Sequence, residues 1–102
     1  MTKDTTHIYG EVNNKTGLKH IFVKIREDVE KANSREDLTE LYKRAGYLIT
    51  LTHAASWEEK FGKELKELRA LAEEEFSRTV CKINSQAKQI GTDANYDETW
   101  GD

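Results

Sequence analysis

The chain has 102 residues, of which 34% are charged and 36% are hydrophobic, and its formal net charge at pH 7 is −3. This length allows one domain with a single core, and a weakly acidic chain lacks the basic surface typical of proteins that bind nucleic acid or anionic membranes. The chain contains no proline, which favours a helical protein. Its single cysteine, Cys81, cannot form an internal disulfide. No apolar run reaches about 18–20 residues, so we expect no signal peptide and no membrane span.

The first 17 residues are expected to form an N-terminal arm. They are mostly polar and end in the turn-forming run Asn-Asn-Lys-Thr-Gly at positions 13–17. The apolar residues Ile8, Tyr9 and Val12 indicate that part of this arm packs on the rest of the molecule.

A first helix is predicted over residues 18–32. Its apolar residues recur every three or four positions, at Leu18, Ile21, Phe22, Ile25 and Val29. A hairpin is the alternative, because Ile21, Val23 and Ile25 also alternate as in a strand and residues 13–17 could form the turn that pairs them with residues 8–12. We expect the helix.

The second predicted helix covers residues 35–55. Ser34 is a good N-cap, because its hydroxyl can accept a hydrogen bond from a free backbone N–H and the acidic Glu36 and Asp37 follow in the first turn. An apolar stripe follows one face, with Leu38, Leu41, Ala45, Leu48, Ile49, Thr52 and Ala55.

This second helix is apolar on another face as well, since no residue in the range 45–57 is charged. The other face carries Tyr47, Leu51 and Ala54. In addition, Gly46, Thr50 and Ala54 recur every four residues and form a row of small side chains that would let another helix approach closely. A helix with two apolar faces lies at the centre of a bundle or in an oligomer interface.

The third predicted helix is the longest and covers residues 57–90. Ser56 and Glu59 match the capping box that begins a helix, which predicts a corner after the second helix, and Gly91 is a conventional C-terminal glycine. Apolar residues follow the helical period throughout, at Trp57, Phe61, Leu65, Leu68, Ala72, Phe76, Val80, Ile83, Ala87 and Ile90.

The length of the third helix predicts self-association. A continuous helix over residues 57–90 would be about 51 Å long, more than the first two helices can cover. Monomers avoid an uncovered apolar stripe, and a second copy related by a two-fold axis is its simplest cover. The expected interface consists of Gly46, Tyr47, Thr50, Leu51, Ala54, Phe76, Val80, Ile83, Ala87 and Ile90.

The predicted fold is all-α, an antiparallel bundle of three helices with a long third helix, completed by dimerisation. A break near Glu74 would fold the last part of that helix back as a fourth helix, although no turn residues mark one. The predicted organisation is an N-terminal arm (1–17), a helical bundle domain (18–91) and an acidic C-terminal tail (92–102). The tail is expected to be aperiodic and loosely ordered, with Tyr96 and Trp100 as its anchors.

The tail contains a partial calcium-loop pattern. Asp93, Asn95 and Asp97 match positions 1, 3 and 5 of an EF-hand loop. However, Glu98 occupies the position that needs glycine, and the bidentate Glu at position 12 would lie beyond residue 102. We therefore expect a solvated acidic tail.

No other motif predicts a metal site or a cofactor. The three histidines, His7, His20 and His53, form no i, i+4 pair and match no helix-borne metal motif. Cys81 lies opposite the apolar stripe of its helix without a neighbouring histidine, so we expect a spectator thiol.

Two functions stay open at this point. Glu27 with Glu30, and Glu64 with Glu67, have half of the spacing with which all-helical nucleotide pyrophosphohydrolases hold magnesium, so a small hydrolase dependent on Mg²⁺ or Mn²⁺ is the alternative. Such pairs are ordinary on exposed helix faces. We therefore favour a cytoplasmic helical protein–protein interaction module that binds itself and a further protein, with no nucleic acid, membrane or cofactor.

Overall fold

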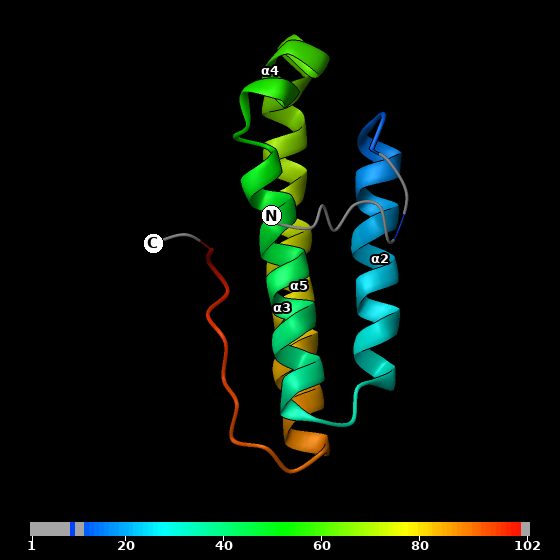
Figure 1. Ribbon diagram of the computed structural model, residues 1–102, viewed down its shortest axis with the longest axis vertical. Helices are drawn as coiled ribbons and strands as arrows, with labels where there is room; N and C mark the ends of the chain where they lie inside the picture. Colours follow the sequence, from blue (N-terminus) through cyan, green and yellow to red (C-terminus); the bar gives the residue numbers. More distant parts are fainter. Residues whose placement is uncertain (1–8, 10–11, 101–102) are drawn as a thin grey trace.

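The computed structural model describes Tyr9 and residues 12–100 of the chain. All regular elements in that part are helical, and α2, α3 and α5 pack side by side, each antiparallel to the next (Figure 1). The elements are α2 (Lys15–Lys31), α3 (Arg35–Leu51), α4 (Ala55–Phe61), a 3₁₀ turn (Gly62–Glu64) and α5 (Leu65–Gln89). The prediction of an all-α fold with three packed helices is therefore confirmed for the described residues.

Helix α2 begins slightly earlier than predicted because Asn14 caps it. The Asn14 side-chain oxygen accepts a hydrogen bond from the Gly17 N–H at 2.8 Å. The hairpin alternative is wrong for the part that can be compared, since the backbone from Ile21 to Ile25 is helical. Residues 1–8, 10 and 11, which include most of the other hairpin strand and much of the predicted arm, lie outside the described part.

Val12 is a member of the predicted arm that packs on the bundle. Its side chain is buried in the core, and its carbonyl oxygen accepts a hydrogen bond from Lys60 Nζ at 2.8 Å. The segment before α2 is therefore fixed to α4.

Helix α3 begins at the predicted residue. The Ser34 hydroxyl accepts a hydrogen bond from the Asp37 N–H at 3.1 Å, which confirms the N-cap. The helix ends at Leu51 instead of residue 55, and the chain turns at residues 52–54. The Thr52 carbonyl oxygen in this turn accepts a hydrogen bond from Arg69 Nε at 2.8 Å, so α5 helps to hold the corner.

The predicted capping box at the corner is wrong. Helix α4 begins at Ala55, with Ala54 in the N-cap position and no side-chain hydrogen bond to the cap. Ser56 therefore lies within the first helical turn, two positions after the N-cap. The corner itself is present, as expected, because the chain leaves the helical conformation before Ala55.

The predicted continuous helix over residues 57–90 is also wrong. Gly62 has a φ of 54°, a value that favours glycine, and the 3₁₀ turn that it begins separates α4 from α5. The molecule is 43 Å along its longest axis, shorter than the about 51 Å that the continuous helix would need. Helix α5 continues through Glu74 without a break.

Gly91 ends α5 as predicted. It has a φ of 82°, its N–H donates to the Lys88 carbonyl oxygen at 3.3 Å, and the Thr92 N–H donates to the Ala87 carbonyl oxygen at 3.0 Å. These two hydrogen bonds form a Schellman motif, which satisfies carbonyl groups at the helix end and redirects the chain.

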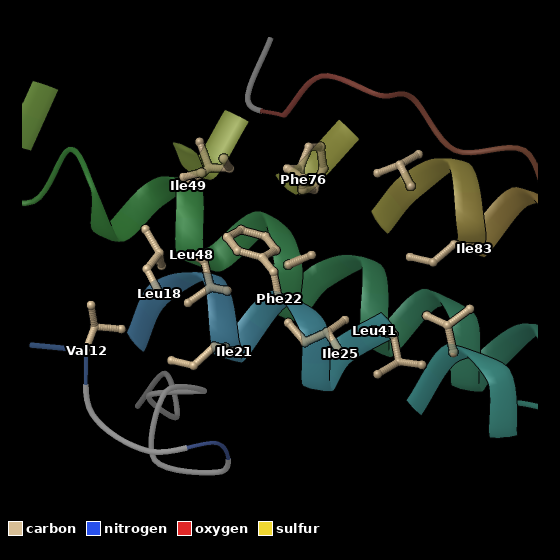
Figure 2. Packing of buried hydrophobic residues seen from close by; sticks show 14 of the residues in the cluster. Val12, Leu18, Ile21, Phe22, Ile25, Leu41, Leu48, Ile49, Phe76 and Ile83 are labelled. Carbon is tan, nitrogen blue, oxygen red and sulfur yellow. The ribbon is translucent and has the colours of Figure 1, made fainter. Parts of the chain in front are cut away.

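The core lies where α2, α3 and α5 meet (Figure 2). Phe22 of α2 and Leu48 of α3 are almost completely buried, and so is the apolar stripe of α5, which consists of Leu65, Leu68, Ala72, Phe76, Val80, Ile83 and Ala87. Its last four members were expected to need a second copy as their cover, together with Ile90, which is partly buried. Because α2 and α3 cover the stripe within one chain, its burial does not require a dimer.

A buried charge lies between α2 and α5. Glu75 is 2% exposed, and its Oε1 lies 2.9 Å from Arg26 Nη2 in an ion pair whose geometry is not that of an aligned hydrogen bond. Arg26 Nη1 donates to Thr79 Oγ1 at 3.3 Å, and this hydroxyl donates to the Glu75 carbonyl oxygen at 2.7 Å. A buried pair is costly to leave unmatched, so this cluster favours one register of α2 against α5.

Candidate functional site

The C-terminal segment, residues 92–100, runs back along the bundle beside α3 (Figure 1). We call it the strap. It contains no helix or strand. Thr92, Ala94, Tyr96 and Trp100 are partly buried, and Asp93, Asn95, Asp97, Glu98 and Thr99 are exposed. The predicted anchors, Tyr96 and Trp100, both pack against the core.

The strap lies against both α3 and α5. We call the surface that receives it the docking surface. It consists of Thr39, Tyr42, Gly46 and Thr50 on α3, with Phe76, Ser77, Cys81 and Asn84 on α5. On α3 these residues are spaced three or four positions from one another. On α5 they have the same spacing except for the adjacent pair Phe76 and Ser77, so in each helix they follow one face.

The indole of Trp100 packs on Gly46. A Cβ atom added to this glycine would lie 2.3 Å from Cδ2 of the indole, so the ring rests on the backbone of α3 where a side chain would otherwise be. The indole Nε1–H donates to Thr50 Oγ1 at 3.1 Å. The small residues of α3 were expected to admit another helix, and two of them receive a tryptophan side chain instead.

Tyr96 is held through its backbone and its ring. Asn84 Nδ2 donates to the Tyr96 carbonyl oxygen at 3.0 Å, and Asn84 Oδ1 accepts from the Tyr96 N–H at 2.8 Å. The ring stacks on Tyr42 with a centroid distance of 4.8 Å, and its hydroxyl lies 2.6 Å from Thr39 Oγ1. One asparagine thus provides the donor and the acceptor that a neighbouring β-strand would provide.

Four aromatic rings meet at the docking surface. Tyr42 lies 5.3 Å from Trp100 and 5.7 Å from Phe76 between ring centroids, within the range of favourable aromatic pairs. Burial raises the pKa of Tyr42, and the carboxylate of Asp97 raises it further. The phenol of Tyr42 therefore stays neutral when the strap is docked at pH values where an exposed tyrosine begins to ionise.

Glu98 connects the strap to α5. The Cys81 thiol donates to Glu98 Oε1 at 3.0 Å, and the Ser77 hydroxyl donates more weakly to Oε2 at 3.5 Å. The hydrogen bond to Glu98 raises the pKa of Cys81, because a thiolate could not donate and would face the carboxylate charge. The docked strap therefore lowers the nucleophilicity of this cysteine.

A cleft of about 450 Å³ remains beside the end of the strap. Its lining residues are Ile49, Glu73, Phe76, Ser77, Glu98, Thr99 and Trp100. The strap therefore leaves space on the docking surface next to Trp100.

A second polar cluster joins Tyr9 to α2 and α3. The Tyr9 hydroxyl donates to Asp28 Oδ2 at 2.9 Å and accepts from Arg44 Nη1 at 3.0 Å, and Arg44 also pairs with Glu40 at 3.3 Å. Burial raises the pKa of Tyr9, although the hydrogen bond from Arg44 acts in the opposite direction. The neighbouring cleft of about 270 Å³ is lined by charges of both signs, which gives no preference for one class of ligand.

The ten predicted interface residues fall into separate groups. Phe76, Val80, Ile83 and Ala87 are at most 2% exposed within one chain. Gly46 and Thr50 contact Trp100. Tyr47, Leu51, Ala54 and Ile90 are partly buried. Self-association through these residues stays a prediction.

Three of the four carboxylates considered for magnesium binding pair with lysines. Glu27 lies 3.5 Å from Lys24 and Glu67 lies 3.2 Å from Lys15, whereas Glu30 pairs with Lys82, which lowers its pKa. Within the described part of the chain, no group of three His, Cys, Asp or Glu residues could hold a metal ion. His20 and His53 are exposed, and His7 lies outside the described residues.

Several docking residues had no clear signal in the sequence. Asn84, Thr39 and Tyr42 are unremarkable positions on helix faces, and their role depends on a segment far along the chain. The alternation of the strap residues is a usable signal, because Ala94, Tyr96 and Trp100 are spaced in steps of two and four between polar residues.

Comparisons with protein-family models, curated proteins and solved structures find no match for this chain. No helix in the described part combines the length and apolarity needed to cross a membrane. The proposals below therefore rest on the geometry of the docking surface.

Proposed function

We propose that this protein is a helical protein–protein interaction module that binds extended protein segments, including its own strap, on the docking surface. One observation supports this proposal: a segment without regular structure is held at its backbone and at two aromatic side chains by groups from both α3 and α5. The self-association expected from the sequence would involve the same two helices.

The chemistry of the docking surface suits one kind of segment. Asn84 binds the backbone of one residue, and Gly46 with Thr50 accepts an indole four residues later. The Cys81 thiol binds a carboxylate between them. Backbone hydrogen bonds provide affinity that does not depend on sequence, and the side-chain contacts provide specificity. The matching partner is an extended segment with an aromatic residue, an acidic residue two positions later and a tryptophan two positions after that.

A segment in another chain could make the same contacts. None of them involves the peptide bonds that connect the strap to α5. The tether does raise the local concentration of the strap, to the millimolar range for a short flexible connection. A partner segment must therefore compete with the strap, and binding in trans is weak unless the strap is displaced.

Peptide binding to a full-length chain with an emptied docking surface tests this proposal. The receptor carries Tyr96→Ala and Trp100→Ala, and the probe is a fluorescently labelled peptide with the sequence of residues 92–102. We expect saturable binding by fluorescence anisotropy. A second receptor with Asn84→Ala in addition, and a probe with Trp100→Ala, should both bind at least tenfold more weakly.

The absence of binding by a receptor that keeps its helical circular dichroism spectrum would refute the interaction proposal. The hydrolase alternative makes a different prediction, because Mg²⁺ or Mn²⁺ would raise the melting temperature of a protein that binds it. We also propose a cytoplasmic location, with which the single unpaired Cys81 is compatible.

A further inference from the structure

The docking surface already fits one known sequence, that of the strap. We propose that the strap of one copy docks on the docking surface of a second copy, so that two copies exchange straps reciprocally and form a homodimer. This inference rests on the proposed function, since it requires the docking surface to accept a segment in trans. It names the partner, a second copy of this chain, and the mode of assembly.

The strap of a second copy brings every group that the docking surface uses. It brings the backbone of Tyr96 to Asn84, the indole of Trp100 to Gly46 and the carboxylate of Glu98 to Cys81. All of these groups lie within residues 96–100, and they contact helices α3 and α5 only. The whole junction can therefore move from one copy to another without a new contact.

The hinge that would open is short and weakly held. The Schellman motif fixes the chain up to Thr92, and the next firm contact is the backbone of Tyr96 at Asn84. Between them, Asp93 is 97% exposed and lies 3.9 Å from Arg35 in a surface ion pair. Such pairs contribute little to stability. Ala94 adds a small, partly buried side chain and a local hydrogen bond from its N–H to Thr92 Oγ1 at 3.3 Å, so residues 93–95 are held less firmly than Tyr96 and Trp100.

The closed form requires a minimum length of hinge. Asn84 and Gly91 are separated by about 10 Å along the axis of α5. The four residue steps from Thr92 to Tyr96 span at most about 13–14 Å when fully extended. Two steps would span about 7 Å, which is too short for Tyr96 to reach Asn84 of the same chain. The length of the hinge therefore decides whether docking within one chain is possible.

Closed monomer and exchanged dimer contain the same junctions. Their balance is therefore set by protein concentration and by the hinge, as in other domain-swapped proteins. A short tether gives an effective concentration in the millimolar range, so the closed monomer predominates in dilute solution and the exchanged dimer grows as concentration rises.

A full chain from which only Asp93 and Ala94 are deleted tests the exchange. We expect light scattering behind size exclusion to show twice the mass of one chain at micromolar concentration, where the wild type is mostly monomeric. The same deletion combined with Trp100→Ala and Tyr96→Ala is the matched control and should be monomeric. A deleted chain that stays monomeric and helical, with Trp100 fluorescence shifted to that of an exposed indole, would overturn the exchange.

A pair of complementary variants gives an independent test. One full chain carries Gly46→Leu and Asn84→Ala, which damage the docking surface, and the other carries Tyr96→Ala and Trp100→Ala, which damage the strap. We expect each to be monomeric alone and the mixture to give a one-to-one heterodimer, because only the mixture contains an intact strap and an intact docking surface. A chain with all four substitutions should form no heterodimer with either.

The two proposals fail in different ways. If the labelled strap peptide binds the emptied docking surface but the deleted chain and the mixed variants stay monomeric, the exchange is wrong and the interaction module stands. If the peptide does not bind either, the interaction module is wrong as well.

Discussion

The contact between α2 and α5 and the contact between the strap and its docking surface are built differently. The first buries Phe22 and Val80 completely and contains one enclosed ion pair, from Arg26 to Glu75. The second leaves its side chains partly exposed, and each of its anchors has a specific hydrogen-bond partner. Apolar burial is non-directional and accumulates over many atoms, whereas hydrogen bonds at a wet surface add little net stability but select one partner geometry. The first contact is suited to permanence and the second to exchange.

The largest expected effect is a cavity in the first contact. Phe22→Ala should lower the free energy of unfolding by about 3–5 kcal/mol, because the side chain is fully buried and its removal leaves a void. Urea denaturation followed by circular dichroism measures this loss. Lys19→Ala, at an exposed position of the same helix, should change stability by less than about 0.5 kcal/mol. Similar losses for the two variants would show that α2 is not part of the core.

The buried charge provides the next effect. Glu75→Ala should lower the free energy of unfolding by about 2–3 kcal/mol, because it leaves Arg26 without its carboxylate between α2 and α5. Glu74→Ala is a matched control one residue away, since Glu74 pairs with Arg78 at the surface. The control should lose at most about 0.5 kcal/mol. If Glu75→Ala and Glu74→Ala lost the same free energy of unfolding, the burial of Glu75 between α2 and α5 would contribute nothing to stability.

Removal of the strap should have a smaller effect. A chain that ends at Gly91 should keep its helical spectrum and lose about 1–2 kcal/mol, since only partly buried aromatic groups are removed and their ordering entropy is recovered. The measurement is thermal and urea unfolding of the truncated and full chains. A loss as large as that of Phe22→Ala would place Tyr96 and Trp100 in the core, contrary to the comparison above.

Substitution of Gly46 by alanine should change the free energy of unfolding in opposite directions with and without Trp100. In the full chain, Gly46→Ala should lower stability slightly, because the new Cβ displaces Trp100 and offsets the better helix propensity of alanine. In a Trp100→Ala background the same substitution should raise stability by about 0.5–1 kcal/mol. The four free energies form a double-mutant cycle. The same effect in both backgrounds would show that the indole does not rest on this glycine.

The smallest effect is a dependence of docking on pH. The pKa of Cys81 is raised above its ordinary value of 9.0 by Glu98, so the folded state favours the neutral thiol. The resulting stabilisation is fully present below pH 9 and is lost as the pH rises through the raised pKa. Trp100 fluorescence should therefore report undocking in the alkaline range. Cys81→Ser keeps a donor for Glu98 that does not ionise, and it should move this transition to higher pH.

The sequence predicted the parts of the fold that depend on local chemistry. The Ser34 hydroxyl caps α3 by accepting a hydrogen bond from the N–H of Asp37, three residues later. The spacing of the apolar residues of α2 identifies its buried face. The break at Gly62 was missed because Phe61 and Leu65 lie four residues apart and are both buried, so the helical period continues across the 3₁₀ turn. The spacing of apolar residues alone cannot reveal a break in a helix when the apolar residues on both sides of the break keep the helical spacing.

The two anchors of the strap, Tyr96 and Trp100, were predicted, but the residues that hold them were not. The contacts of these anchors with α3 join residues separated by 50 or 57 positions, as between Trp100 and Thr50 or Tyr96 and Thr39, and no local pattern encodes such pairs. The strap also contains Glu98, an exposed acidic residue whose hydrogen bond to Cys81 has no signal in the sequence. Whether a polar side chain is buried at a surface contact depends on the residues that face it, and these come together only when the helices have packed.

The pairing of Asn84 with the Tyr96 backbone sets a rule for chain length. Loops at protein surfaces commonly tolerate inserted and deleted residues. Here the clamp fixes Tyr96, and Gly46 with Thr50 fixes the indole of Trp100, so three residues must span the distance between two fixed points. One residue inserted between Tyr96 and Trp100 should displace the indole from Gly46. The strap should therefore vary through substitution at its outward positions while keeping its length constant from Tyr96 to Trp100.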